Sequence, residues 1–295
     1  MIELFQEDEI RNDYRSSKGN QLKWNTGGFW YKADSNGYEG LAEYLVSNLL
    51  MKSSLVPAMV TSYETEEIRY RSRVYRGCKS KNFLRDGEAL ITLERLYWHA
   101  KGNRSLYKTI FSIPNETDRV RFLVNEIQQI TGLSNFGEYL CLLLEIDALF
   151  LNEDRHMHNI AVILQSDGTY RLAPVFDNGA CLLSDTEMDY PMSEDPINLI
   201  HTVKSKTIAA GFQEQLDALG NLYPQQIRFD FSPQDVNRIL EAEPFYPQDI
   251  KNRIRVFITK QISLFLQNTS PGFTKIFSPH LQIKIPHYYK MGNFF

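Results

Sequence analysis

Two stretches of the sequence decide the fold, Leu149-Phe-Leu-Asn-Glu-Asp-Arg-His-Met-His-Asn-Ile-Ala-Val-Ile163 and Leu172-Ala-Pro-Val-Phe-Asp-Asn-Gly179. In the first stretch the apolar end of a helix leads into a charged loop and then into a short apolar strand. A turn signal with Asp and Gly separates it from a second short strand, which opens the second stretch. The pattern therefore places Asp154, Asn159 and Asp177 at the ends of rigid elements.

Two carboxylates and an amide suit phosphoryl transfer, which needs a positioned nucleophile and a metal held by oxygen ligands. Asp154 and Asn159 have the spacing of the catalytic Asp and metal-binding Asn in a kinase catalytic loop, and Asp177-Asn-Gly179 is a variant of the Asp-Phe-Gly element. Each part alone is more often structural, because Asp154 could pair with Arg155 in a turn and Asp-Asn-Gly is a common turn sequence. Their joint occurrence favours a kinase site.

Length and composition agree with a globular protein. The chain has 295 residues, enough for two domains or two lobes, with 43% apolar and 23% charged residues. The net charge of −4 argues against a dedicated nucleic-acid binder, so we expect no direct nucleic-acid partner. We also expect no membrane association, since the longest apolar run, at 140–151, is broken by Glu145 and Asp147.

The N-terminus and the cysteines indicate the cell compartment of the newly made protein. The first nine residues are acidic and lack the positive region and apolar core of a signal peptide. Three widely spaced cysteines, Cys78, Cys141 and Cys181, form neither a disulfide framework nor a CxxC metal site. We therefore expect a cytoplasmic protein at synthesis, which leaves room for export as an effector by a dedicated secretion machine.

The pattern along the chain predicts an α+β fold with the two-lobed plan of a protein kinase. A β-rich N-lobe over 1–84 is followed by a mostly helical C-lobe over 85–295. Strands are predicted at 21–24, 29–33, 58–63 and 68–75, with a helix at 39–51 and a linker at 75–83. Helices are predicted at 115–132, 138–151, 208–219, 233–243 and 247–266. A long polar loop that cannot pack a core is predicted at 183–196, and an irregular tail from 267.

The N-lobe holds candidates for binding phosphate groups. Lys32 lies on a predicted strand, and a carboxylate on the next helix would hold it, with Glu43 preferred over Glu39. Otherwise Lys32 is a solvated strand lysine. The turn at 16–20 could lay backbone N–H groups over the phosphates. Its candidate cofactor-binding residues are Ser17, Lys18, Gly19 and Asn20, although a single glycine matches a Gly-rich loop poorly.

The signature also supports a resemblance to a known family. Asn152-Glu-Asp-Arg-His-Met-His-Asn159, followed by Ala173-Pro-Val-Phe-Asp-Asn-Gly179, resembles the signature of the HipA-like bacterial Ser/Thr protein kinases. The segment from Tyr31 to Tyr44 resembles that family's strand lysine and helix glutamate, including those of its compact, single-chain, CtkA-like members. The resemblance implies a protein-kinase-like fold, ATP and Mg²⁺ as cofactors, and transfer to a protein Ser or Thr, often with autophosphorylation. An antitoxin-like or host protein is the implied partner.

The resemblance also implies roles for single residues. Asp154 is the catalytic base, Asn159 and Asp177 are the metal ligands, and Lys32 binds the phosphates of ATP. His156, in the same motif, has a structural place there and is counted with the residues that bind the cofactor.

Other interpretations of the signature remain open. A kinase-fold phosphotransferase for small molecules shares the same residues, and a non-catalytic module would share only the fold. His156 and His158 with Asp154 could suggest zinc, but no third ligand cluster with zinc spacing is visible. Asp147, inside an apolar helix, needs a partner, which we expect to be backbone or an Arg or His near the loop. The 183–196 loop holds four candidate phosphorylation sites, Ser184, Thr186, Tyr190 and Ser193, although any one of them is more often a plain solvated loop residue.

Overall fold

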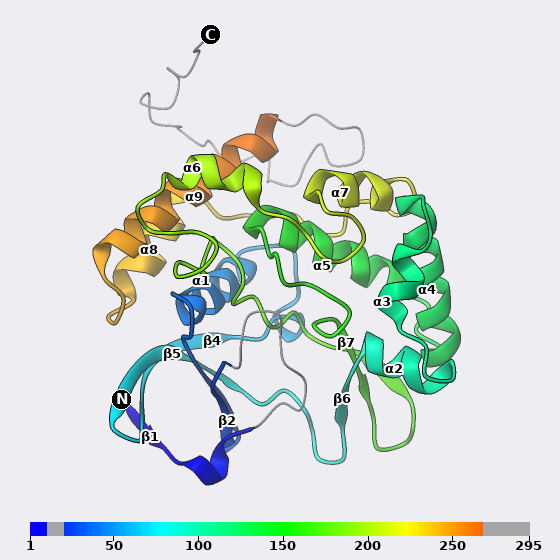
Figure 1. The fold of residues 1–295 in the computed structure, drawn as a ribbon, viewed down its shortest axis with the longest axis horizontal. Coiled ribbons are helices and arrows are strands. Elements are labelled where there is room, and N and C mark those ends of the chain that lie inside the picture. Colours follow the sequence, from blue (N-terminus) through cyan, green and yellow to red (C-terminus); the bar gives the residue numbers. More distant parts are fainter. Residues whose placement is uncertain (11–20, 268–295) are drawn as a thin grey trace.

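The structure is a computed structural model that describes residues 1–10 and 21–267. It confirms the α+β class, with a curled sheet formed by the first part of the chain and a mostly helical remainder. In Figure 1 the larger sheet lies below helix α1 (Glu39–Leu50), and α1 separates it from the helices near the end of the described chain. The predicted tail from 267 and the predicted phosphate-binding turn at 16–20 lie almost entirely outside the described residues.

The larger sheet has five strands in the order β1-β4-β5-β3-β2. β1 runs parallel to β4, and the other pairs are antiparallel. Because β3 pairs with β2 on one side and β5 on the other, its residues are fixed from both edges. The strands are β1 (Ile2–Leu4), β2 (Lys23–Thr26), β3 (Phe29–Ala33), β4 (Tyr63–Tyr70) and β5 (Arg73–Lys81).

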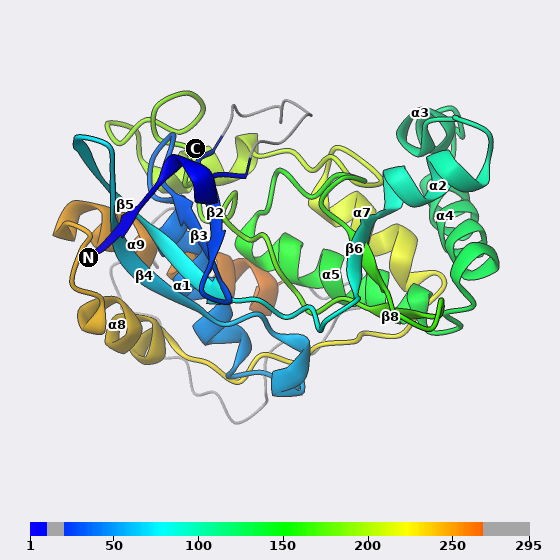
Figure 2. The same ribbon diagram turned by 90° about the horizontal axis from the view of Figure 1, so that it is seen from below.

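A smaller antiparallel sheet of β6 (Ala89–Thr92), β7 (Ala161–Leu164) and β8 (Tyr170–Leu172) lies beside the first sheet (Figure 2). β6 brings the start of α2 against the loop that precedes β7. There the Leu93 N–H donates to the Ile160 carbonyl at 2.9 Å and the Glu94 N–H to the Met157 carbonyl at 3.0 Å. The second half of the signature loop is therefore held against the start of α2.

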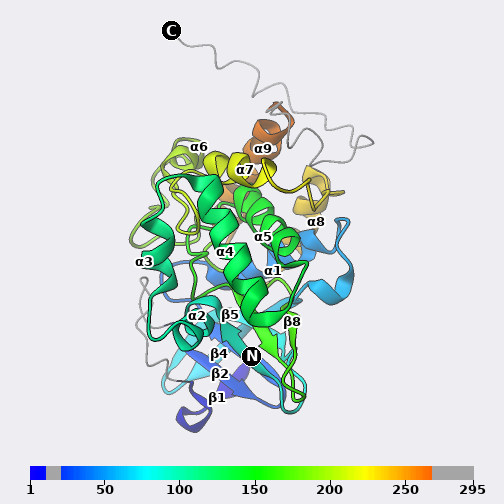
Figure 3. The same ribbon diagram turned by 90° about the vertical axis from the view of Figure 1, so that its right-hand side faces the viewer.

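Capping residues set several helix boundaries. Asn115 accepts from the Asp118 N–H at the start of α4, which ends at Gly132 in the left-handed region. Ser232 forms a capping box with Asp235 at the start of α8. Figure 3 shows the later helices on the side of the molecule away from the larger sheet. After α1, the helices are α2 (Leu93–Ala100), α3 (Leu106–Phe111), α4 (Glu116–Thr131), α5 (Phe136–Phe150), α6 (Pro196–Leu199), α7 (Phe212–Gly220), α8 (Pro233–Ala242) and α9 (Gln248–Gln267), and 3₁₀ turns lie at η1 (Gln6–Asp8), η2 (Pro57–Met59) and η3 (Ile200–Thr202).

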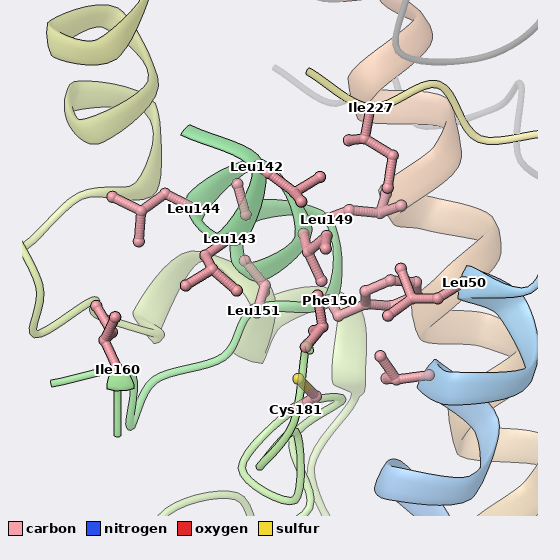
Figure 4. Close-up of a cluster of buried hydrophobic side chains, with 14 of the residues drawn as sticks. Leu50, Leu142, Leu143, Leu144, Leu149, Phe150, Leu151, Ile160, Cys181 and Ile227 are labelled. Atoms are coloured by element: carbon pink, nitrogen blue, oxygen red, sulfur yellow. The ribbon is translucent and has the colours of Figure 1, made fainter. Parts of the chain in front are cut away.

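The main hydrophobic core surrounds α5, of whose 15 residues 14 are buried. Figure 4 shows part of this core, with Leu149 and Phe150 of α5 and Leu50 of α1. Each fully buried leucine or phenylalanine stabilises the fold by about 1.5–3 kcal/mol. Since α1 packs into this core, it joins the larger sheet to the helical part. The division of the chain into lobes after residue 84 stays a prediction.

Three predictions about the N-terminal strands are wrong. The predicted linker at 75–83 is mostly β5, the middle strand of the sheet, and the predicted strand at 68–75 spans the turn between β4 and β5. Arg71 adopts the left-handed conformation there, with φ of 54°. Gly77 weakened the strand signal, yet the sheet requires it, because a Cβ there would lie 2.1 Å from the Lys32 carbonyl oxygen. The predicted strand at 58–63 gives way to η2, and β4 begins only at Tyr63.

The polar loop and the helix after it also differ from prediction. The 183–196 stretch does pack, since Tyr190 is buried and its hydroxyl donates to Glu153 Oε2 at 2.6 Å. Arg253 of α9 donates to the Tyr190 carbonyl at 2.9 Å. The helix predicted from residue 208 begins at Phe212, because the Ile208 N–H is bound by the Gln215 side chain instead. Side chains therefore bind backbone groups of this region, which lets it pack although it contains few apolar residues.

Candidate active site

Strand β3 and helix α1 bring Lys32 and Glu43 together. Lys32 Nζ lies 2.6 Å from Glu43 Oε1, and both side chains are buried. Glu39, the other candidate, turns away and accepts from the Asn36 N–H at 2.8 Å and the Ser35 hydroxyl at 3.0 Å. The carboxylate that contacts the lysine is therefore that of Glu43.

The same lysine reaches Asp177 from the second half of the signature. Lys32 Nζ lies 2.7 Å from Asp177 Oδ1, and the Asn178 N–H donates to Glu43 Oε2 at 2.8 Å. Asp177 has a left-handed backbone with φ of 60°, which turns the chain sharply at this point. We call these four residues, Lys32, Glu43, Asp177 and Asn178, the clamp cluster. It joins β3, α1 and the segment after β8.

Charges in the clamp cluster reinforce one another. Burial alone would lower the pKa of Lys32, but the Asp177 and Glu43 carboxylates hold that pKa well above its ordinary value. Burial alone would raise the pKa of Asp177, but the Lys32 ammonium has the larger effect and lowers that pKa below its ordinary value. Both groups are therefore charged at neutral pH. Lys32 Nζ also lies 5.4 Å from the centre of the Tyr63 ring, a cation–π distance.

The catalytic-loop residues Asp154 and Asn159 contact each other directly. Asn159 Nδ2 donates to the Asp154 carbonyl at 2.8 Å and lies 3.3 Å from Asp154 Oδ2. Within residues 1–10 and 21–267, Asn159 Oδ1 accepts no hydrogen bond, so an oxygen ligand remains available there. The loop itself starts where α5 ends, at Leu151 with φ of 52°.

Arg155 anchors the catalytic loop through buried contacts with other segments. It is almost wholly buried, and its Nε lies 3.0 Å from Asp147 Oδ2. It also donates to the Phe176 carbonyl at 2.8 Å and to Asn178 Oδ1 at 2.9 Å. Burial alone would lower the pKa of Arg155, but Asp147 raises it above its usual value, so the guanidinium stays charged. Asp147 thus has the kind of partner that its position required, and Arg155 does not pair with Asp154.

Asn178 connects the two halves of the site. Its backbone N–H binds Glu43, and its side-chain oxygen accepts from Arg155. The motif named this position only as a variant of the central residue of Asp-Phe-Gly. The side-chain oxygen of Asn178 is a physical reason for the variant, because a phenylalanine could not accept from Arg155.

Lys206 is a site residue that the sequence did not reveal. It comes from the segment between η3 and α7, and its Nζ lies 3.0 Å from Asp154 Oδ1. No motif marks this lysine, which is separated from the aspartate by 52 positions. His156 Nε2 is farther from the same oxygen, at 3.8 Å. Burial lowers the pKa of His156, so this ring is neutral at pH 7.

Some predicted site residues cannot be placed. Ser17, Lys18, Gly19 and Asn20 lie within the segment 11–20, outside the described residues. The described residues contain no group of three or more His, Cys, Asp or Glu side chains that could hold a metal ion. They also contain no helix long and apolar enough to cross a bilayer.

Comparisons with known proteins agree on the fold. No protein-family model matches this sequence, and no curated protein sequence matches it. The structure is similar to the crystal structure of a Helicobacter pylori proinflammatory kinase, CtkA. The TM-score is 0.56 at 16% identity, over 89% of this chain and 95% of that chain. The kinase-like fold is thereby confirmed, and at fold level it supports a kinase-like phosphotransferase.

Proposed function

We propose that the protein is an ATP- and Mg²⁺-dependent Ser/Thr protein kinase of the HipA-like type, and that it phosphorylates itself. The observation that carries this proposal is the contact of one lysine with two carboxylates from distant parts of the chain. Lys32 bonds both Glu43 and Asp177, across 145 positions in the second case. A kinase needs this arrangement, because the lysine that binds phosphate and the carboxylate that binds the metal must lie next to each other.

Each residue of the site has a chemical task in this reaction. Asp154 would accept the proton of the attacking hydroxyl. Lys32 would neutralise phosphate charge, held in place by Glu43. Bound Mg²⁺ and ATP would supply charge neutralisation and the phosphoryl group. Because Asn178 and Arg155 fix both halves of the site, these groups are positioned before a substrate arrives.

The oxygen donors present fit magnesium. Mg²⁺ is usually held by one or two protein oxygens and completes its shell with waters and phosphate oxygens. Asp177 offers a carboxylate whose pKa is lowered, and Asn159 offers the amide oxygen Oδ1. Two oxygen ligands are too few for zinc, which takes three or four protein ligands that are mostly nitrogen or sulfur. The two residues would therefore hold Mg²⁺ only together with nucleotide.

Incubation with γ-labelled ATP and Mg²⁺ tests the proposal. Label should appear on serine or threonine of the protein itself, and Asp154→Asn and Asp177→Asn should each remove it. Glu39→Gln is the matched control, because Glu39 lies on the same helix as Glu43 but does not contact Lys32. This control should keep the label.

Other results would change the assignment. ATP turnover with a metabolite, without labelling of any protein, would show a small-molecule phosphotransferase. Failure to bind ATP would exclude both enzymes. The protein substrate, and an antitoxin-like or host protein partner, would be sought among proteins labelled by the wild type and not by Asp154→Asn.

A further inference from the structure

Lys206 is held against the catalytic loop by the residues on either side of it in the chain. The Ser205 N–H donates to the Ala210 carbonyl at 2.9 Å and closes a turn around the lysine. The Thr207 hydroxyl donates to the Arg155 carbonyl, next to Asp154 in the chain. Lys206 is therefore attached to the catalytic loop through a neighbour as well as through its own ammonium group.

The side chain of Lys206 is far more exposed than that of its neighbour Thr207, which binds the catalytic loop. Thr207 is fully buried, whereas the Lys206 side chain keeps 37% of its surface exposed. An ion pair this exposed stabilises a fold by only about 0–1 kcal/mol. Stability therefore gives little reason for a lysine at this point. A cation beside Asp154 instead lies where phosphoryl transfer concentrates negative charge.

We propose that Lys206 is a further catalytic residue, whose ammonium bridges Asp154 and the phosphoryl group in transit. The inference rests on the proposed function and adds to it a cation from the segment before α7. Lys32 has different partners, because its Nζ is bound by Glu43 and Asp177 and not by Asp154. The two lysines would thus act on different phosphate groups.

The step can be written with all atoms balanced. The substrate hydroxyl oxygen forms a bond to the γ-phosphorus of a nucleoside triphosphate, and its proton passes to the Asp154 carboxylate. The bond from the γ-phosphorus to the bridging oxygen breaks, and its electron pair leaves with the nucleoside diphosphate. Lys206 stays protonated and donates hydrogen bonds to Asp154 and to a γ-phosphoryl oxygen, where charge develops.

Steady-state kinetics of Lys206→Met test the assignment. Loss of one donor to the developing charge should lower kcat about 10²-fold, with KM for ATP nearly unchanged. Lys206→Arg, which keeps the positive charge, should recover part of the rate. Lys204→Met is the matched control. Lys204 is exposed, lies two positions away and forms no ion pair within the described chain, so this variant should match the wild type.

A binding measurement separates catalysis from structure. Lys206→Met should bind ADP as tightly as the wild type does but bind ADP with aluminium fluoride, a mimic of the phosphoryl group in transit, at least tenfold more weakly. Equal weakening of both ligands, or wild-type kcat in Lys206→Met, would overturn the assignment. An inactive wild type would instead count against the proposed function.

Discussion

The two halves of the site differ in how they hold their charges. In the clamp cluster, Lys32 and Glu43 are buried and held at 2.6 Å. On the catalytic loop, Asp154 and Lys206 lie 3.0 Å apart with the lysine 37% exposed. Taking charges out of water costs several kcal/mol, so a buried pair must keep all its partners, whereas an exposed pair need not. We infer that substitutions in the clamp cluster affect stability and activity together, and that substitutions of the partly exposed pair Asp154 and Lys206 affect activity alone.

Arg155→Met should have the largest effect, because Arg155 serves both halves. It would leave the buried Asp147 without its counter-charge, a loss of about 3–5 kcal/mol in the free energy of unfolding. Urea denaturation measures this loss. The double variant Asp147→Leu with Arg155→Met should recover much of it, because no buried charge remains. A loss below 1 kcal/mol in the single variant would contradict the anchoring role of Arg155.

Lys32→Met should come next and should lower both stability and activity. The buried Glu43 would lose its partner, at a cost of about 2–4 kcal/mol, and phosphoryl transfer would fall about 10²-fold or more. Denaturant melts and labelling with γ-labelled ATP on the same preparation measure both effects. Full stability with lost activity would show that the two halves do not differ as we infer.

Asp34→Asn tests a contact between the β3–α1 loop and the segment before α9. Asp34 accepts from the Tyr246 hydroxyl at 2.6 Å and from the Gly40 N–H at 2.6 Å. Burial, and then Glu39, raise the pKa of Asp34 from 3.8 to about 7. The folded protein therefore binds this proton more tightly than the unfolded chain, so the stabilisation is complete below the unfolded pKa and is lost as pH rises towards 7.

The asparagine has no such proton to lose. Between pH 4 and pH 7, the free energy of unfolding of Asp34→Asn should rise relative to that of the wild type by roughly 1–3 kcal/mol. Denaturation midpoints at several pH values measure the difference. Parallel curves for the two proteins would show that Asp34 does not titrate in this range.

Asp154→Asn should have the smallest effect on stability and sharpens the comparison from the other side. Its partner Lys206 is partly exposed, so the free energy of unfolding should change by less than about 1 kcal/mol. Thermal unfolding of the inactive variant measures this directly. A loss above 2 kcal/mol would show that the catalytic loop depends on this carboxylate for its structure.

Local patterns predicted those parts of the fold and site that sequence neighbours determine. The signature loop, its flanking strands and the helices that begin near residues 115 and 233 follow from short-range rules. The preference for Glu43 over Glu39 follows from the same kind of rule, because only Glu43 lies on the apolar face of α1 that points into the protein. The proximity of Lys32 to Asp177 needed the resemblance as well, since no local rule brings positions 145 apart together.

Tertiary contacts decided what the sequence alone could not show. The sequence predicts a linker in place of β5, because the middle strand of the sheet requires Gly77 and a glycine weakens the strand signal. Tyr190 is held by hydrogen bonds to Glu153 and Arg253, which lie far from it in the chain. Lys206 had no signal at all, because a single lysine in a polar segment resembles any solvated residue.

The close approach of α1 to β5 has a consequence for control. A Cβ on Gly40 would lie 2.5 Å from the Gly77 carbonyl carbon, and nine of the 12 residues of α1 are buried. Movement of this helix away from β5 would expose its buried residues, so the pairing of Glu43 with Lys32 is completed when the protein folds. We expect such an enzyme to be competent from the moment it is made. A cell would then govern it through the amount produced and the molecules it meets, and not through a later rearrangement of this helix.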